Sequence, residues 1–371
     1  MKLPDRFPDF SRNRLSWQDQ KGLEIFKDVL YAEQEQNPRW DLPGHGSAFA
    51  TCGDVFALGC DKTGVHPNGK VFRRLQVTSC RKKSCPVDYE SWGSNEAEKG
   101  LVRMAVYVIG NAPVAEIIRE FKKAYEKAPK KIFHEKFVIA VQKEMRKKAF
   151  DRKLPFGERR RFRPFHVVFS PPQDHKWDTA QDFIDDKNTA YEIAKAHGID
   201  AGCLIPHPYR LRCKKCRSVI PDHRKKCCNT KCGSKEFEWF FSPHFHCIGF
   251  GWLNWTKQDY EETRWVVKNL SDGNNGDRSV YATLRYLLSH CGVSRFHSLT
   301  WFGNLGYHAK LMLDRNPIPK VGSLRSLCPV CGSFLRPLKW IGLDRPPPDL
   351  EYSKDPYKND SWNDPKDWRC F

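Results

Sequence analysis

A cysteine-rich segment, RCKKCRSVIPDHRKKCCNTKCGS, constrains the fold of this chain more than any other feature of its sequence. Its first pair of cysteines is Cys213 and Cys216. The second pair is Cys228 with Cys232, or alternatively Cys227 with Cys232. Four thiolates bind zinc tetrahedrally, and these short spacings let tight turns present the sulfur atoms together. The segment therefore predicts a zinc ribbon, with free reduced cysteines as the alternative.

Further cysteines outside the ribbon are candidates for zinc binding. The six candidates are Cys52, Cys60, Cys80, Cys85, Cys328 and Cys331. The first four have looser spacing and are expected to form a second site. The last two form a good C-x-x-C pair without an obvious second half. That pair completes the N-terminal site, binds together with a histidine such as His308, or serves as a half-site in a dimer.

The rest of the sequence favours metal binding over disulfide bonding. The opening residues MKLPDRFPDFSRNRL contain no apolar core of a secretory signal, so we expect a cytoplasmic protein with reduced thiols. No run of 18 or more apolar residues occurs, so no membrane span is expected.

The charge balance points to a polyanionic partner. Lys and Arg number 63 against 44 Asp and Glu, which gives a formal net charge of +19, and 13% of residues are aromatic. Basic side chains neutralise phosphates and aromatic rings stack on bases, so this composition favours a nucleic acid. A basic surface without a dedicated partner and docking on anionic membranes are the alternatives.

Hydrophobic patterning predicts strands and helices that alternate through the middle of the chain. Strands are expected at 161–172, 201–207 and 236–253, and helices at 178–197 and 279–291. The basic pattern at 113–150 is expected to form two helices divided at Pro129. The zinc ribbon at 211–235 lies between two expected strands, which makes it an insertion. The tail from residue 345 is expected to be extended or partly disordered.

His244 and His246 lie two residues apart in the strand-like segment SPHFHCIGFGW. Side chains alternate between the faces of a strand, so both imidazoles are expected on one face, with Phe245 and Cys247 in the core on the other. Two imidazoles on one face supply half of a site for a divalent metal ion. Such an ion can act on a phosphate oxygen as a Lewis acid. Structural histidines in a strand are the alternative interpretation.

The helical segment SVYATLRYLLSHCG contains two candidate nucleophiles, Tyr281 and Tyr286. They lie five residues apart, about 140° around a helix, so they do not share a face. Tyr286 shares its face with small and polar residues, which suits an open active site. Tyr281 shares its face with leucines and Arg285, which is typical of a packed aromatic. We therefore expect Tyr286 to be the nucleophile, although both tyrosines can also be core residues.

Three segments, in this order, resemble the HUH-endonuclease replication initiators of rolling-circle plasmids and viruses, especially the archaeal ones. FHVVFSPP is similar to the first motif, a strand that ends at Ser-Pro-Pro. PHFHCIGFGW is similar to the paired-histidine motif. YATLRYLLSHCGV, followed by HSLTWFGNLGY, is similar to the tyrosine motif. The resemblance covers roughly residues 161–310.

The resemblance implies an α+β fold, with a ferredoxin-like or RRM-like antiparallel catalytic sheet that carries the histidines on a central strand. The zinc ribbon is then an insert, and a helical, cysteine-containing region precedes the sheet. The implied cofactor is Mg²⁺ or Mn²⁺. The family adds a third metal ligand, for which Glu238 is the candidate, with His166 and Glu236 as alternatives. The family commonly has lysine three residues after the nucleophile, where this chain has Ser289.

These patterns divide the chain into three expected regions. They are an N-terminal region at 1–155, a nuclease domain at 156–310 with its ribbon insert at 211–235, and a C-terminal knuckle and tail at 311–371. Arg81, Lys82 and Lys83 are expected on a turn facing DNA, and Arg285 is expected to contact DNA beside the tyrosines.

The function implied by the resemblance is site-specific nicking and rejoining of one DNA strand at a replication origin through a 5′-phosphotyrosine. No GxxxxGK[ST] phosphate loop is present, so a host helicase and polymerase are the expected partners. One alternative is a transposase or relaxase with the same chemistry. A relaxase usually carries a histidine triad, and none stands out in the sequence. Another alternative is a non-catalytic zinc-ribbon protein that binds DNA.

Overall fold

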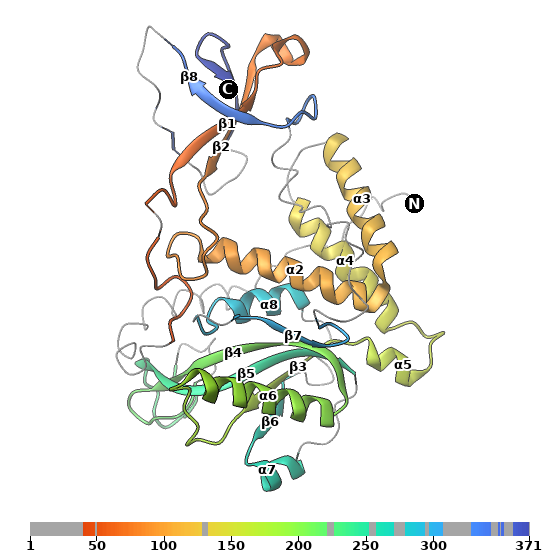
Figure 1. Cartoon of the computed structure of the whole chain (residues 1–371), viewed down its shortest axis with the longest axis vertical. Helices are drawn as coiled ribbons and strands as arrows, with labels where there is room; N and C mark the ends of the chain where they lie inside the picture. Colours follow the sequence, from red (N-terminus) through yellow and green to blue (C-terminus); the bar gives the residue numbers. More distant parts are fainter. Residues whose placement is uncertain are drawn as a thin grey trace.

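The chain is an α+β protein whose described residues form two five-stranded antiparallel sheets separated by a layer of helices (Figure 1). The architecture comes from a computed structural model. The structure describes residues 40–48, 50–127, 133–220, 226–251, 257–270, 279–293, 297–306, 328–342, 348, 350–351 and 359–370. His308, a candidate ligand for the C-x-x-C pair, lies outside these residues.

The large sheet has the strand order β6-β3-β5-β4-β7. Its strands are β3 (Phe165–Ser170), β4 (Ile199–Cys213), β5 (Phe237–Gly251), β6 (Val266–Asn269) and β7 (Thr300–Gly303). The two long strands β4 and β5 pair antiparallel and form its centre. The strands expected at 201–207 and 236–253 are confirmed as β4 and β5, and the one expected at 161–172 is confirmed over Phe165–Ser170 as β3, because Arg161 ends the helix α5. β4 ends at Cys213 and β5 begins at Phe237, so the ribbon is inserted in the β4–β5 connection, as the sequence predicted.

An irregularity in the β4–β5 pairing coincides with prolines. His207 pairs with His244, but the next aligned pair is Tyr209 with Phe241, so two residues of β5 lie opposite Pro208. Proline has no N–H for a sheet ladder and is tolerated inside sheets mainly at bulges. The irregularity bends the strands next to the histidines.

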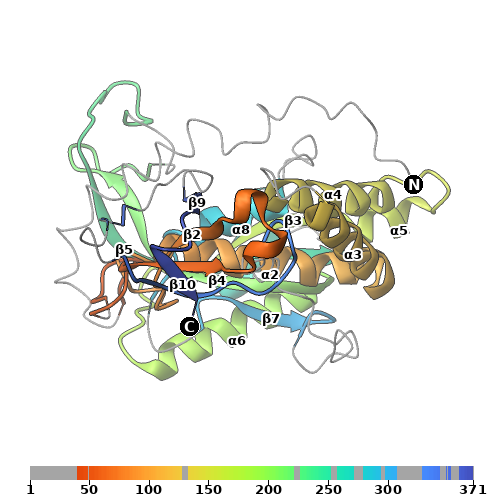
Figure 2. The ribbon, with the colours of Figure 1, turned by 90° about the horizontal axis from the view of Figure 1, so that it is seen from above.

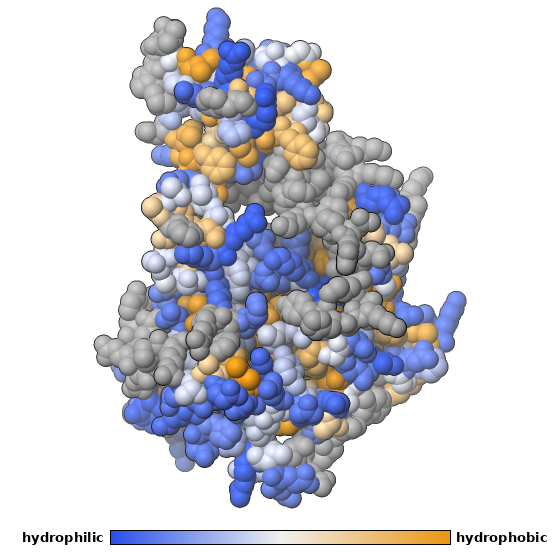
Figure 3. Space-filling model, in the orientation of Figure 1, coloured by the Kyte–Doolittle hydropathy of each residue, from blue (hydrophilic) through white to orange (hydrophobic). Residues whose placement is uncertain are grey.

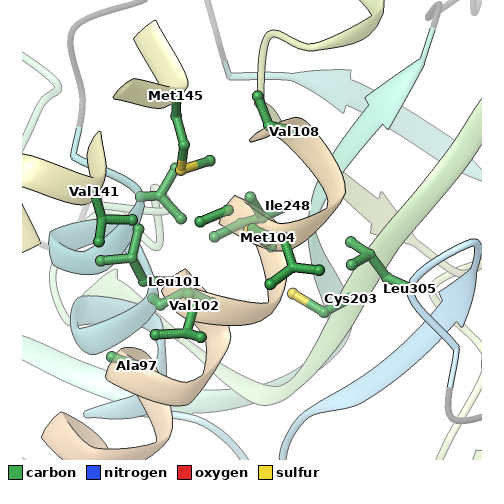
Figure 4. Packing of buried hydrophobic residues seen from close by; sticks show 14 of the residues in the cluster. Ala97, Leu101, Val102, Met104, Val108, Val141, Met145, Cys203, Ile248 and Leu305 are labelled. Carbon is green, nitrogen blue, oxygen red and sulfur yellow. The ribbon is translucent and has the colours of Figure 1, made fainter. Parts of the chain in front are cut away.

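One face of the large sheet is covered by helices. They are α2 (Tyr89–Ile109), α3 (Asn111–Lys127), α4 (Phe133–Ala149), α5 (Phe156–Arg161) and α8 (Val280–Leu288). Leu101 and Met104 of α2 pack there on Cys203 and Ile248 of the sheet (Figure 4). The helix expected at 279–291 is confirmed as α8. The pattern at 113–150 forms two helices, α3 and α4, and residues 128–132 between them, including Pro129, are outside the description.

The opposite face is covered by α6 (Ala180–Ala196), which confirms the helix expected at 178–197. Thr179 begins it with a capping box, in which its side chain accepts from the N–H of Asp182 and the Asp182 carboxylate accepts from the N–H of Thr179. Trp177 is fully buried under this helix, with its ring centroid 5.0 Å from that of Phe245. Phe245 and Cys247 are fully buried on this face, as expected. A short helix, α7 (Lys257–Thr263), precedes β6.

The small sheet joins the two ends of the described chain in the order β10-β8-β1-β2-β9. Its strands are β1 (Val55–Cys60), β2 (Val71–Val77), β8 (Arg336–Trp340), β9 (Asp360–Asn363) and β10 (Trp368–Cys370), and two 3-10 turns at Thr63–Val65 and Pro67–Gly69 lie between β1 and β2. Seen from above, this sheet lies over α2, opposite the large sheet (Figure 2).

The small sheet corrects two expectations about the ends of the chain. Residues 359–370 form strands instead of an extended tail, because β9 pairs with β2 and β10 pairs with β8. Arg74 of β2 holds β9 through a bidentate ion pair, in which its Nε and Nη2 atoms donate to the two carboxylate oxygens of Asp360 at 2.6 and 2.5 Å. The expected N-terminal and C-terminal regions therefore share one sheet and are not separate units.

The surface in Figure 3 is mostly hydrophilic over the large sheet, whereas apolar side chains are more frequent around the small sheet. Phe334 and Val65 near the small sheet are 72% and 59% exposed. No described helix is long and apolar enough to cross a membrane.

We predict that Gly100→Leu lowers the free energy of unfolding and displaces α8. A Cβ at Gly100 on α2 would lie 2.7 Å from Leu284 Cδ1 of α8, and overpacking of this kind costs about 1–3 kcal/mol. Denaturant unfolding checks the loss. Gly157→Leu in α5 is the matched control, because nothing lies within 4 Å of its Cβ position. Equal stability of the two variants would contradict close packing between α2 and α8.

Candidate metal centre and tyrosine helix

Three histidines converge on the face of the large sheet that α2 and α8 cover. His207 lies on β4, and His244 and His246 lie on β5. The strand register sets His207 directly opposite His244. One ring nitrogen of each histidine lies within 4.8 Å of the other two, which is a spacing that one metal ion can bridge. We call these three residues the histidine triad.

Two histidines of the triad are oriented by a contact through their other ring nitrogen. His244 Nδ1 lies 2.8 Å from the Ser242 carbonyl, and His246 Nδ1 lies 2.7 Å from His166 Nε2. His207 lies close enough to the main chain of Leu287 on α8 for that group to act on the pKa of its imidazole. Outer contacts of this type fix the tautomer and the ring orientation of metal-binding histidines.

Burial keeps the triad in the form that binds metal. His207 is 1% exposed and His244 is 5% exposed. Burial lowers the pKa of His207, His244 and His246 well below the usual value for histidine, and for His244 the nearby Arg210 charge lowers the pKa further. The imidazoles are therefore neutral at physiological pH, as metal ligands must be.

The donor set fits a divalent metal ion. His207 Nε2 is buried and makes no hydrogen bond to any described residue, which leaves it available as a ligand. The cluster holds three imidazole nitrogens and, within the described chain, no carboxylate. Three histidine ligands with an open position are typical of catalytic metal sites. Nitrogen ligands favour a first-row transition ion over Mg²⁺, which prefers oxygen.

The expected third ligand, Glu238, does not lie near the histidines. It forms ion pairs with Arg212, at 2.7 Å, and with Arg217. It also precedes His244 by six residues, which is about 20 Å along a strand. The alternative candidate Glu236 is exposed just before β5 begins. The other alternative, His166, contacts the Nδ1 atom of His246 and is not part of the triad. His207 takes the place that the sequence interpretation gave to these residues.

The tyrosine helix α8 lies across the triad. Its N-terminus is capped by Ser279, whose side chain accepts from the N–H of Ala282. The ring centroids of Tyr286 and His290 lie 4.7 Å apart, and those of His290 and His207 lie 4.5 Å apart. Tyr286 is thus joined to the triad by a continuous series of ring contacts. Tyr281 and Tyr286 are both half-buried and both pack against the helical core, so the contact with His290 is what distinguishes Tyr286.

Two further residues beside the triad were missed by the sequence interpretation. Arg210 donates to Ser170 Oγ at 2.7 Å, and its charge acts on His244. Ser170 is the serine of the Ser-Pro-Pro motif at the end of β3, so that motif holds a cation next to the histidines. His290 directly follows Ser289 at the end of α8. In the sequence, His207 and Arg210 could have been found only from the segment IPHPYR, which continues the strand expected at 201–207 and contains both residues.

In the expected zinc ribbon the four thiols that come together and could hold a metal ion are those of Cys213, Cys216, Cys227 and Cys232. Sulfur atoms approach to 3.6 Å between Cys213 and Cys232 and to 3.3 Å between Cys216 and Cys227. Around one zinc ion the edge of a sulfur tetrahedron is about 3.8 Å, so these distances suit zinc. Cys228, the first choice from spacing, instead directs its thiol at the Val219 carbonyl, and Cys227 takes its place.

A second cluster joins the two ends of the chain. It consists of Cys60, His66, Cys328 and Cys331. His66 Nδ1 lies 3.0 Å from the Lys70 carbonyl, and His66 Nε2 lies 3.3 Å from Cys328 Sγ. The C-x-x-C pair therefore completes a site from the N-terminal part, which was one of the three alternatives. Such a set of three thiolates and one imidazole can hold a structural zinc ion.

The remaining cysteines of the expected N-terminal site, Cys52, Cys80 and Cys85, form a third cluster without Cys60. The basic turn beside this cluster, Arg81 to Lys83, is only partly exposed. Arg81 and Lys82 are exposed, whereas Lys83 is half-buried and donates to Ser298 Oγ at 3.1 Å. Arg285 is half-buried on α8.

Comparison with known proteins identifies no relative. No protein-family model matches the chain, and no curated protein or solved structure is significantly similar to it.

We predict that Cys227→Ser lowers the zinc content by about one ion per chain, because it removes one of four thiolates. Elemental analysis of the purified protein measures the change. Cys228→Ser is the matched control and should retain the full zinc content. The reverse pattern would return Cys228 to the site.

We also predict that acid destabilises the protein without added divalent ions while its structural zinc is retained. Above pH of about 6.5 the triad is neutral in both the folded and the unfolded chain. Below it the unfolded chain takes up protons that the folded chain, with its lowered pKa values, does not. The free energy of unfolding should therefore fall by up to about 1.4 kcal/mol per pH unit for each histidine.

Thermal unfolding between pH 7.5 and pH 5.5 measures this slope. His207→Gln removes one titrating group and should make the slope shallower. Identical slopes for the two proteins would contradict a buried, neutral His207.

Proposed function

We propose that this chain is a metal-dependent tyrosine endonuclease that nicks one DNA strand and rejoins it. The observation that carries the proposal is the series of ring contacts from Tyr286 through His290 to His207. It places the most polar part of the tyrosine helix beside a buried set of metal ligands. A DNA-binding protein without catalysis has no need for this arrangement.

The topology supports an HUH-type catalytic domain. The elements β3, α6, β4, β5, α7 and β6 follow one another as a βαββαβ unit, with strands in the order β6-β3-β5-β4. This is the plan of a ferredoxin-like sheet. The histidine pair lies on its central strand β5, and α8 with β7 extends the unit. These features agree with what the motif resemblance implies.

A divalent ion on the triad would supply Lewis-acid stabilisation of charge on a phosphate oxygen. The protein supplies the ligands and their orientation. The Ser242 carbonyl and His166 orient the rings of His244 and His246 before any ion binds. The triad nitrogens suit Mn²⁺ or another transition ion better than Mg²⁺.

The nucleophile in the proposed reaction is the Tyr286 hydroxyl. Its oxygen forms a bond to the scissile phosphorus as the bond from phosphorus to the 3′-oxygen breaks. The phenol loses its proton and the departing 3′-oxygen gains one. The product is a 5′-phosphotyrosine and a free 3′-hydroxyl. No phosphodiester energy is lost, so attack by a 3′-hydroxyl reverses the step and rejoins the strand.

Arg210 is the residue that we assign to the phosphate itself. The family pattern commonly has lysine three residues after the nucleophile, and this chain has Ser289 there, which bonds back to the Tyr286 carbonyl at 2.6 Å. Arg210 comes from β4 and lies close enough to His244 for its charge to lower the pKa of that histidine. A guanidinium is suited to binding phosphate oxygens in pairs.

DNA is the partner that the charge supports. The chain carries a formal charge of +19, and Arg81 and Lys82 are exposed on the turn whose next residue, Lys83, contacts the segment after α8. We propose that this turn contacts the DNA backbone while Lys83 fixes the turn. Replication from a plasmid or viral origin, with host helicase and polymerase, is the biological role that this chemistry fits.

A relaxase is the second candidate, and the triad itself favours it. A relaxase usually carries a histidine triad, and His207 with His244 and His246 provides one. Both enzymes use the same chemistry on different DNA sites. Cleavage assays on replication-origin, transfer-origin and transposon-end oligonucleotides distinguish the candidates.

We predict that Tyr286→Phe abolishes covalent attachment to a labelled single-stranded oligonucleotide. The hydroxyl that attacks phosphorus is lost, whereas the ring that packs on His290 is kept. Denaturing gel electrophoresis in the presence of Mn²⁺ detects the adduct. Tyr281→Phe is the matched control on the same helix and should form the adduct at nearly the wild-type rate.

His207→Ala should reduce the rate of adduct formation by about 10²-fold or more, because the triad loses one of three ligands. Adduct formation that survives Tyr286→Phe would refute the assignment of the nucleophile. Survival in His207→Ala would refute the triad as the metal site.

A further inference from the structure

The cluster of Cys52, Cys80 and Cys85 has three thiols where a structural zinc ion needs four ligands. The Sγ atoms of Cys52 and Cys85 lie 3.5 Å apart, and all three Sγ atoms lie within 4.8 Å of one another. Structural zinc is almost always four-coordinate. Cys60, which the spacing had assigned here, belongs to the cluster with His66. No described His, Cys, Asp or Glu offers a fourth ligand atom within 4.8 Å of all three thiols, so a fourth ligand from this chain has to move toward them from a neighbouring loop.

We propose that His45 is the fourth ligand and that Cys52, Cys80, Cys85 and His45 bind a zinc ion. The loop that carries His45 is bonded to the loop that carries Cys85 on both sides of the histidine. The N–H of Gly44 donates to the Lys83 carbonyl at 3.1 Å, and the N–H of Gly46 donates to the Ser84 carbonyl at 2.6 Å.

The surroundings of His45 suit a metal ligand. His45 is half-buried, and the Asp41 carboxylate lies within electrostatic range of its imidazole. A carboxylate beside a ligand histidine is a common second partner that raises its basicity. Asp88 is the competing donor near Cys80. Its carboxylate accepts from Ser79 Oγ at 2.6 Å and from the N–H of Arg81, so it is used in shaping the loop.

The proposed zinc ion would brace the segment that follows the tyrosine helix. Lys83, two residues before Cys85, donates to Ser298 Oγ, and Ser298 Oγ donates to the Gly292 carbonyl at 2.9 Å. The N–H of Gly292 donates in turn to the Pro206 carbonyl at 2.7 Å, one residue before His207.

The His45 loop reaches the same segment directly. Asp41 and Val293 form an isolated antiparallel bridge with N–H to carbonyl distances of 2.9 and 2.7 Å. Both loops of the proposed site therefore contact residues on either side of this segment, Val293 and Ser298, and Gly292 is bonded to β4. The zinc site does not depend on the proposed nuclease function, but its value to catalysis rests on that function.

Zinc retention by the full-length protein tests the ligand set. Cys85→Ser should lower the zinc content by about one ion per chain. His45→Ala should release one ion to a competing chelator roughly tenfold faster or more than wild type, and His45→Cys should restore retention, because a thiolate can replace the imidazole. His45→Ala should also change the absorption bands of the Co²⁺-substituted protein.

His297→Ala is the matched control, because His297 adjoins Ser298 in the braced segment and is exposed. It should leave zinc retention and the Co²⁺ spectrum unchanged. Loss of the ion in His297→Ala but not in His45→Ala would overturn the assignment of His45. A full zinc content in Cys85→Ser would overturn the site itself.

Hydrogen exchange tests the bracing role without any nuclease assay. The amides of Gly292 and Val293 should exchange at least roughly tenfold faster in His45→Ala than in wild type, because the loops that hold them are loosened. Unchanged exchange together with zinc loss would leave a zinc site and refute the brace. Failure of the nicking assay alone would leave both results standing, so the two proposals fail separately.

Discussion

The ring contacts of His290 join β4 to the tyrosine helix, and the proposed site depends on them. The centroid of the His290 ring lies 4.5 Å from that of His207 on β4 and 4.7 Å from that of Tyr286 on α8. The main chain of Leu287, one residue beyond Tyr286, also approaches His207. Because the proposed metal ligand and the proposed nucleophile meet at one junction, a shift of either element moves both, and their packing would preorganise the proposed site.

The surrounding protein packs on both sides of this junction. Trp177 and Phe245 fill the reverse face of the sheet, so β5 cannot turn its histidines away without opening a cavity. The helical core closes the other face, with Leu284 of α8 packed at Gly100 of α2. The ribbon cysteines Cys213 and Cys227 belong to the same buried cluster as Trp177 and Phe245. The small sheet has only a small apolar cluster beside Cys60 and Cys328, so a metal ion held there would contribute to its folding.

Local patterns in the sequence predicted what depends on local periodicity. The strands around His244 and Phe169, the helix with Tyr286 and the position of the ribbon all follow from alternation, turn residues and spacing. What the sequence interpretation missed depends on pairing between distant segments. The β4–β5 register sets His207 opposite His244, and Cys60 contacts Cys331, which lies 271 positions away in the sequence. Glu238 was a reasonable candidate by residue type, but two arginines neutralise it far along the strand.

Identification of the amino acid that carries the DNA tests the central claim most directly. Trypsin cleaves after Arg285, so Tyr281 lies in the peptide SVYATLR and Tyr286 begins the peptide YLLSHCGVSR. After reaction with an oligonucleotide and nuclease trimming, mass spectrometry with fragmentation should find the nucleotide phosphate on Tyr286. A modification on Tyr281, on another residue, or no covalent product under Mn²⁺ conditions would contradict the account.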